Sequence, residues 1–213
     1  MAVSTVKVLT ALALLTPSAQ ATAAALVDAQ QAILLDAQST EVDLRTNSAV
    51  FHKVRISQGN MSIIADQGQA TKHTSGLDFD NSVWVFRGNV KITMDQGHLT
   101  SDDAQITFAN KTIANAVANG KPAEFEEPIA KTGKIAHGHA DTIDYDVTKS
   151  QVHFSKSAYL NNGDHEISAE SLRYNILAQT VVADEAEQGS QRVHIIITPP
   201  PKTAPPKSPP PKP

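Results

Sequence analysis

The sequence contains no cysteine, and only 5% of its 213 residues are aromatic. Without cysteine the chain can form neither a disulfide framework nor a thiolate metal site, and it has no cysteine nucleophile. Its formal net charge of -4 offers no excess of positive charge for nucleic acid. Beyond the N-terminus the chain has no apolar run of about 18 residues, so no later segment is expected to span a bilayer as a helix. What remains is one globular domain with a single core.

Two terminal segments are expected to lie outside this domain. Residues 1–21 carry Lys7, an apolar stretch, a proline and then Ala19-Gln20-Ala21, which is the pattern of a cleaved signal peptide. A retained membrane anchor is the alternative. Residues 199–213 are rich in proline, which predicts an extended, disordered tail. The folded domain is therefore expected to occupy residues 31–198.

A short pattern occurs four times, near the end of each expected strand, at intervals of about 30 to 40 residues. It consists of a small residue, an acid and then alternating apolar positions. Its copies start at Ala65-Asp66, Ser101-Asp102, Ala140-Asp141 and Ala169-Glu170. A period of this length marks stacked units that cannot bury their apolar faces alone.

A second pattern gives each unit its shape. Residues 84–92 alternate apolar and polar side chains with the period of a strand. Elsewhere, alternating stretches meet at Gln58-Gly59 and at Asn162-Gly163, which are turn signals. Helical periodicity is weak throughout. The sequence therefore predicts an all-β fold, in which repeated hairpins form a jelly-roll-like stack of antiparallel strands.

Six short motifs follow one another in this part of the chain. They are Gln58-Gly59 with Ile63, Ala65 and Asp66; Phe86-Arg87-Gly88-Asn89-Val90; Ala118-Asn119-Gly120-Lys121-Pro122-Ala123-Glu124-Phe125; Gly138-His139-Ala140-Asp141 with Tyr145; Ser157-Ala158-Tyr159-Leu160; and Arg192-Val193-His194-Ile195-Ile196-Ile197. In this order they resemble the LptA (OstA-like) family of periplasmic lipopolysaccharide transport proteins. Residues 75–115 differ from the compact form of that family and are expected to add a hairpin pair.

The resemblance implies a twisted antiparallel β-jelly roll, open at both ends, whose interior holds the acyl chains of lipopolysaccharide through its lipid A part. It implies a periplasmic, non-enzymatic protein of Gram-negative outer-membrane biogenesis, without a cofactor. Copies would associate head to tail between an inner-membrane LptC-like protein and an outer-membrane LptD-like translocon. If the N-terminal segment is retained, an LptC-like, membrane-anchored component of the same pathway is the alternative.

The inward rows of the expected strands are the candidate lipid-binding residues. The alternation selects Ile33, Leu35, Val42, Leu44, Ile56, Ile63, Trp84, Phe86, Val90, Ile92, Phe125, Tyr145, Val147 and Phe154. Among them, the resemblance assigns lipid contact to Ile33, Leu35, Phe125, Tyr145 and Val147. For each position an ordinary sandwich core is the alternative.

The first and last strands are expected to expose unpaired backbone groups. The residues of these edges are Ile33, Leu34 and Leu35 at one end and Val193, His194, Ile195, Ile196 and Ile197 at the other. Head-to-tail pairing of such edges does not close, so it predicts open filaments. A filament-forming repeat protein without a ligand is a further interpretation.

Two polar groups invite a catalytic interpretation. His137, His139 and Asp141 share one face of an expected strand, and cupin enzymes, which are jelly rolls, use such a row for metal. The glycines and acids around them do not fit the cupin spacing, which favours solvated strand residues. Asp102 and Asp103 point to opposite faces, so they do not form a general acid/base pair. The sequence therefore predicts neither a catalytic nor a metal site.

The expected trough has no basic cluster beside it. Recognition is therefore expected to depend on acyl chains, with the phosphorylated head group left in solvent. If a phosphate site exists, Lys131, Lys134 and His137 are its candidates.

Overall fold

The computed structural model describes residues 31–43, 45, 48–71, 79, 81–184 and 193–197. The expected signal peptide, the proline-rich tail and Leu44 lie outside these residues. Within them the chain forms twelve β-strands: β1 (Leu34–Asp36), β2 (Ser39–Asp43), β3 (Ser48–Gln58), β4 (Met61–Thr71), β5 (Val83–Met94), β6 (Gly97–Ala109), β7 (Thr112–Pro128), β8 (Ile135–Asp146), β9 (Gln151–Asn161), β10 (His165–Asn175), β11 (Thr180–Asp184) and β12 (His194–Ile197). The described residues contain no helix of the length and apolar character needed to cross a membrane.

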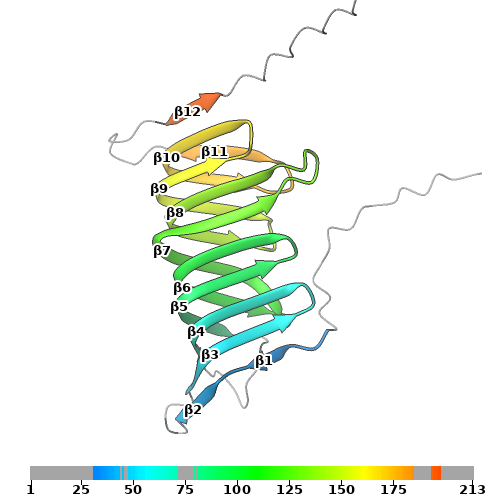
Figure 1. The fold of residues 1–213 in the computed structure, drawn as a ribbon, viewed down its shortest axis with the longest axis vertical. Helices are drawn as coiled ribbons and strands as arrows, with labels where there is room; N and C mark the ends of the chain where they lie inside the picture. Colours follow the sequence, from blue (N-terminus) through cyan, green and yellow to red (C-terminus); the bar gives the residue numbers. More distant parts are fainter. Residues whose placement is uncertain are drawn as a thin grey trace, which may run out of the picture.

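The strands from β3 to β10 pair with their neighbours in chain order, and every pair is antiparallel. Figure 1 shows them as rungs stacked along the long axis of the molecule. Residues 75–115 supply β5, β6 and the start of β7, in the middle of this stack. The prediction of an all-β antiparallel jelly roll built from repeated hairpins is confirmed.

Most of the long strands bend once near the middle. The pairing register shifts between Arg87 and Val90 in β5 and between Asn119 and Ala123 in β7. Comparable shifts occur in β4, β6, β8 and β10. Because a bulge kinks a strand and increases its twist, aligned bulges fold one sheet into two layers.

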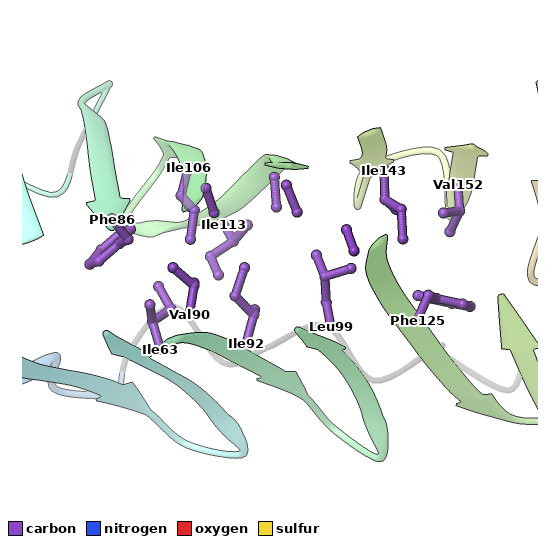
Figure 2. Close-up of a cluster of buried hydrophobic side chains, with 14 of the residues drawn as sticks. Ile63, Phe86, Val90, Ile92, Leu99, Ile106, Ile113, Phe125, Ile143 and Val152 are labelled. Atoms are coloured by element: carbon purple, nitrogen blue, oxygen red, sulfur yellow. The ribbon is translucent and has the colours of Figure 1, made fainter. Parts of the chain in front are cut away.

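The inward side chains of the two layers point toward each other, as Figure 2 shows. We call the half-strands that carry Ile63, Val90, Ile92, Leu99 and Phe125 layer 1, and those that carry Phe86, Ile106, Ile113, Ile143 and Val152 layer 2. These side chains form one continuous hydrophobic core along the stack.

The repeated pattern of a small residue and an acid lies at the bends, not near the strand ends as the sequence suggests. Ala65, Ala140 and Ala169 are buried there, while the neighbouring acids, such as Asp141, face outward. The two layers meet along the bend, so only a small side chain fits on the inside. The repeat therefore marks the positions at which the strands bend, not the hairpin turns.

Polar side chains bridge the strands along the outside of the bend. Lys53 Nζ lies 2.6 Å from Asp66 Oδ1, and Asn89 Nδ2 donates to Asp66 Oδ2 at 2.7 Å. The hydrogen bond from Lys53 is the main reason that the pKa of Asp66 lies below its ordinary value. Gly88, at φ +77°, is required in the same bend, because a Cβ there would lie 2.6 Å from Asp66 Oδ2.

On the side opposite the bends, each layer ends in its own hairpin turns. Layer 1 turns at residues 59–60, 95–96, 129–134 and 162–164, and layer 2 turns at residues 110–111, 147–150 and 176–179. In the described part of the chain, strands therefore connect the layers only along the bend. We call the opposite long edge the open side.

Both ends of the stack carry short strands. At the N-terminal end β1 pairs with the layer 1 half of β3 and β2 with the layer 2 half. At the C-terminal end β12 pairs with the layer 1 half of β10 and β11 with the layer 2 half. Among the described residues the outer edges of these four strands have no further strand beside them. The sheet is therefore open at both ends.

Candidate functional site

Most of the predicted lipid-binding residues lie together between the two layers. Fully or almost fully buried are Ile56, Ile63, Trp84, Phe86, Val90, Ile92, Phe125 and Phe154. Partly buried and packed against them are Ile33, Leu35, Tyr145 and Val147. The structure thus gathers twelve of the fourteen predicted positions into one interior.

The remaining two positions differ. Val42 is 62% exposed, so it is not part of the buried interior, although it pairs opposite the buried Ala49 and lies on the same face. The reason is its place on β2, a five-residue end strand that pairs only with β3 and whose residues are all exposed. Leu44 lies outside the described residues.

The interior also contains side chains that the sequence analysis did not select. The larger ones are Phe51, Val54, Met61, Leu99, Ile106, Phe108, Ile113, Ile143, Val152, Leu160, Leu172 and Tyr174. All continue the inward rows of β3, β4 and β6–β10. The same alternation, carried through every strand and through the bends, would have found them.

Aromatic rings form one cluster toward the N-terminal end of the interior. Trp84 stacks with Phe79, Phe51 and Phe86, with ring centroids 4.8, 5.7 and 6.1 Å apart. Within the described part of the chain, the buried atoms Trp84 Nε1 and Ser82 Oγ have no hydrogen-bond partner. A buried donor without a partner costs about 1–3 kcal/mol, so this cluster holds polar atoms that a bound molecule could satisfy.

A second cluster lies farther along the stack. The ring of Phe125, in layer 1, packs edge-on against Phe154 at 5.8 Å and Tyr145 at 6.2 Å, both in layer 2. Gly138 lies beneath it, where a Cβ would be 2.6 Å from the Phe154 ring. Two residues after Phe125, the same inward row ends in a carboxyl group, Glu127, at the open side.

Glu127 occupies a partly buried place. Its carboxylate lies over Gly97, because a Cβ on Gly97 would overlap Glu127 Oε2. Burial, and secondly the charge of Asp95, raises the pKa of Glu127 to about 7. Burial followed by the charges of Glu127 and Asp95 raises the pKa of Tyr145 to about 12. Burial, then the Glu127 charge, also raises the pKa of Tyr174. The sequence analysis missed this polar group, because Glu127 follows Glu126 in an exposed-looking acidic run.

Comparison with known proteins is consistent with this architecture. The model of the family described as "LptA/(LptD N-terminal domain) LPS transport protein" matches residues 69–180, which extend from β4 to β11 and make up more than half of the chain. The chain belongs to this family.

Among solved structures, one similar chain is LptH, described as the LptA homologous periplasmic component of the conserved lipopolysaccharide transport device from Pseudomonas aeruginosa. The two share 20% sequence identity with a TM-score of 0.44, over 82% of this chain and 100% of LptH. No protein with a curated description matches the chain.

In this member of the LptA/LptD N-terminal family, two of the three candidate phosphate ligands are paired with carboxylates. Lys134 Nζ contacts Asp164 Oδ1 and donates to Gly163 O at 3.2 Å. His137 Nδ1 lies 3.1 Å from Glu126 Oε1. Lys131, the third candidate, is exposed and forms no ion pair with a carboxylate among the described residues. Recognition dominated by acyl chains therefore stays a prediction.

The histidine row does not form a metal centre in this family member. His137 contacts Glu126, while His139 stacks on the Tyr159 ring at 4.8 Å. Over the described ranges, the His and acidic residues form no group of three that could hold a metal ion. Asp103 Oδ1 accepts a hydrogen bond from Asn119 Nδ2 at 3.0 Å, so this acid links two strands at the bend.

Proposed function

We propose that this protein is a periplasmic, non-enzymatic carrier that binds the acyl chains of lipopolysaccharide between its two layers. The observation that supports this most is the continuous apolar interior, which runs through β3–β10. Among the described residues, strands connect the two layers around it only along the bend. An ordinary core would hold the same residue types, but membership of a family of lipopolysaccharide transport proteins supports a lipid ligand for this interior.

Burial of acyl chains supplies the driving force. Each methylene removed from water contributes about 0.8 kcal/mol, so a lipid with several long chains needs an apolar path across an aqueous compartment. The lining is aliphatic and aromatic, which binds chains without strongly directional contacts. Such binding lets a chain slide, because no single position forms a deep free-energy minimum.

The interior side chains pack against each other in the described structure, so the lipid must replace these contacts. We infer that the layers separate at the open side, where hairpin turns end each layer, while the bend remains the hinge. The unpartnered Trp84 Nε1 can then donate to a carbonyl of the bound lipid. We therefore include Trp84 Nε1 in the proposed lipid site.

We propose that copies join head to tail through the end strands, so that the interiors of successive copies align. β1 and β2 would face an upstream partner, an LptC-like inner-membrane protein or another copy. β11 and β12 would face a downstream copy or an LptD-like translocon. The exposed Leu34, Ile195, Ile196 and Ile197 at these ends supply apolar surface for such contacts.

Site-specific photo-crosslinking tests the lipid site. A crosslinker at Phe125 or Tyr145, on the inward rows, should capture lipopolysaccharide in cells. At Lys91 or Arg173, which are exposed on the outer face, it should not. Equal capture at all four positions would contradict the assignment of the interior as the lipid site. N-terminal sequencing of the exported protein would separate the cleaved carrier from the anchored, LptC-like alternative.

A further inference from the structure

A single carboxyl group interrupts the apolar character of the interior at the open side. Glu127 is the last inward residue of the layer 1 half of β7, two positions beyond the buried Phe125. The glycine at position 97 of β6, directly opposite in the pairing, leaves the space that the carboxylate fills. The two side chains opposite it in layer 2, Tyr145 and Tyr174, are phenols at the ends of β8 and β10.

In the described part of the chain, the charged group that acts on Glu127 is another acid and not a cation. The β5–β6 turn contributes Asp95, a second acid, and layer 2 contributes the phenols of Tyr145 and Tyr174. On β6 the opposite residue is Gly97, and on β8 it is Ala136. The nearest histidines, His98 and His137, lie on the outer face, where they contact Thr93 and Glu126.

This environment makes the charge of Glu127 depend on pH near neutrality, since burial raises its pKa to about 7. The charged form places a negative group beside Asp95, where the two layers end. The protonated form is neutral and can donate a hydrogen bond to a ligand oxygen. An anionic head group held at the open side would therefore meet repulsion in one state and a donor in the other.

We propose that Glu127, seated over Gly97 and facing Tyr145 and Tyr174, is a proton-linked selectivity residue that disfavours anionic amphiphiles at the open side when charged and accepts them when protonated. The proposal rests on the proposed function, since it takes the interior as the lipid site. It adds to that function a preference for the charge of the ligand, with binding coupled to proton uptake.

Two naphthylamine dyes that differ in charge test the proposal. Anilinonaphthalene sulfonate carries a sulfonate that does not titrate near neutral pH, and phenylnaphthylamine is uncharged. For the wild-type protein, the Kd of the anionic dye should rise by about threefold to tenfold from about pH 5.5 to about pH 8.5, because the Glu127 charge appears in this range. The Kd of the neutral dye should change by less than about twofold.

Three variants test whether Glu127 causes the pH dependence of anionic-dye binding. Glu127→Gln should bind the anionic dye tightly at both pH values, with no slope. Glu124→Gln, on the outer face of the same strand, should keep the wild-type profile. Gly97→Ala should displace the carboxylate toward solvent and move the midpoint of the profile to lower pH, while Glu127 itself is retained.

The outcomes separate this proposal from the proposed function. If both dyes bind and the anionic dye shows no pH dependence, or if Glu127→Gln keeps the wild-type slope, the selectivity role is wrong and the lipid site stands. If neither dye binds at any pH, the lipid site itself is wrong, and the selectivity role with it. A loss of slope in Glu124→Gln would show that the effect is not specific to Glu127.

Discussion

At the scale of single residues, Gly138 shows how closely the two layers pack. A Cβ at this position would lie 2.6 Å from the Phe154 ring and 3.3 Å from Leu160. Phe154 is fully buried and packs against Phe125, so it has little freedom to move away. We expect Gly138→Ala to destabilise the protein by about 1–3 kcal/mol, as other overpacked cores do, measured by urea unfolding.

Gly97→Ala is the matched control for that substitution. Its new Cβ would meet the end of the flexible Glu127 side chain and no rigid ring. A cost of less than about 1 kcal/mol is therefore expected. If both variants unfold at the same urea concentration as the wild type, the layers are not packed as closely as the structure shows.

Glu127 should also make the stability of the fold depend on pH. Its pKa is about 7 in the folded protein against an ordinary value of 4.5, so ionisation costs more in the folded state than in the unfolded state. Folded stability is therefore lost as pH rises from 4.5 to about 7, and the penalty is complete above that. We expect Glu127→Gln to raise the free energy of unfolding by about 1–2 kcal/mol at pH 8, since the group is partly solvent-exposed, and to leave it unchanged at pH 4.

Urea unfolding of Glu127→Gln and Glu124→Gln at the two pH values measures this difference. The outer-face variant should show no such gain at either pH. A stabilisation by Glu127→Gln that is equal at pH 4 and pH 8 would mean that the carboxyl charge is not its cause.

At the scale of the strands, the bend is the feature that turns hairpins into a two-layered fold. Asn119 lies at the bend of β7 and connects it to both neighbours. Its Nδ2 donates to Asp103 of β6 at 3.0 Å, and its Oδ1 accepts from Thr142 Oγ1 of β8 at 3.0 Å. The amide therefore joins three strands where the backbone pairing is interrupted.

Asn119→Ala should destabilise the protein by about 1–3 kcal/mol, because it leaves two partners without their hydrogen bond. Gln105→Ala, at an exposed position of β6, is the control and should change stability by less than about 0.5 kcal/mol. Thermal unfolding followed by circular dichroism provides the comparison. An Asn119→Ala protein as stable as the control would show that the backbone alone holds the bend.

The sequence predicts the strands of this fold better than their bends. Alternation of apolar and polar residues identifies the inward rows, and Gln58-Gly59 and Asn162-Gly163 mark real turns. The bends give no such signal, because a bulge shifts the alternation by one position inside a strand without a turn residue being required. The small-plus-acid repeat is in fact their signature, and it can be read only once the two layers are known.

For the whole molecule, the sequence predicts the burial of site residues inside the stack better than that of residues on the end strands. Positions within the stack, such as Ile63 and Phe125, are covered by the opposite layer and were predicted correctly to face inward. Val42 lies on the same face as the buried Ala49 but is exposed, because the alternation does not say whether anything covers the last strand. Glu127 was missed for the opposite reason, since its burial depends on Gly97 and on two tyrosines that lie far away in sequence.

The two ends of the molecule are the surfaces through which we propose that it assembles. β12 pairs with β10 on one side only, and its four residues are all exposed, so its other edge can accept a strand from another chain. At the opposite end, β1 has three residues and also pairs on one side only, with β3. Joined in this way, copies extend as open filaments, because the contact uses two different surfaces of each copy.

Replacing Ile196 with proline tests this joint. Proline removes a backbone N–H from β12, which weakens either its pairing with β10 or its pairing with the next copy. We expect Ile196→Pro to lower the end-to-end association constant by about tenfold or more, equivalent to about 1.4 kcal/mol, while folding and lipid binding persist. Ile196→Thr, which keeps the N–H and a β-branched side chain, should associate nearly as well as the wild type. Sedimentation velocity over a range of protein concentrations measures both variants. If the proline variant assembles like the wild type, the C-terminal edge is not the joint, and a bridge would need contacts elsewhere on the molecule.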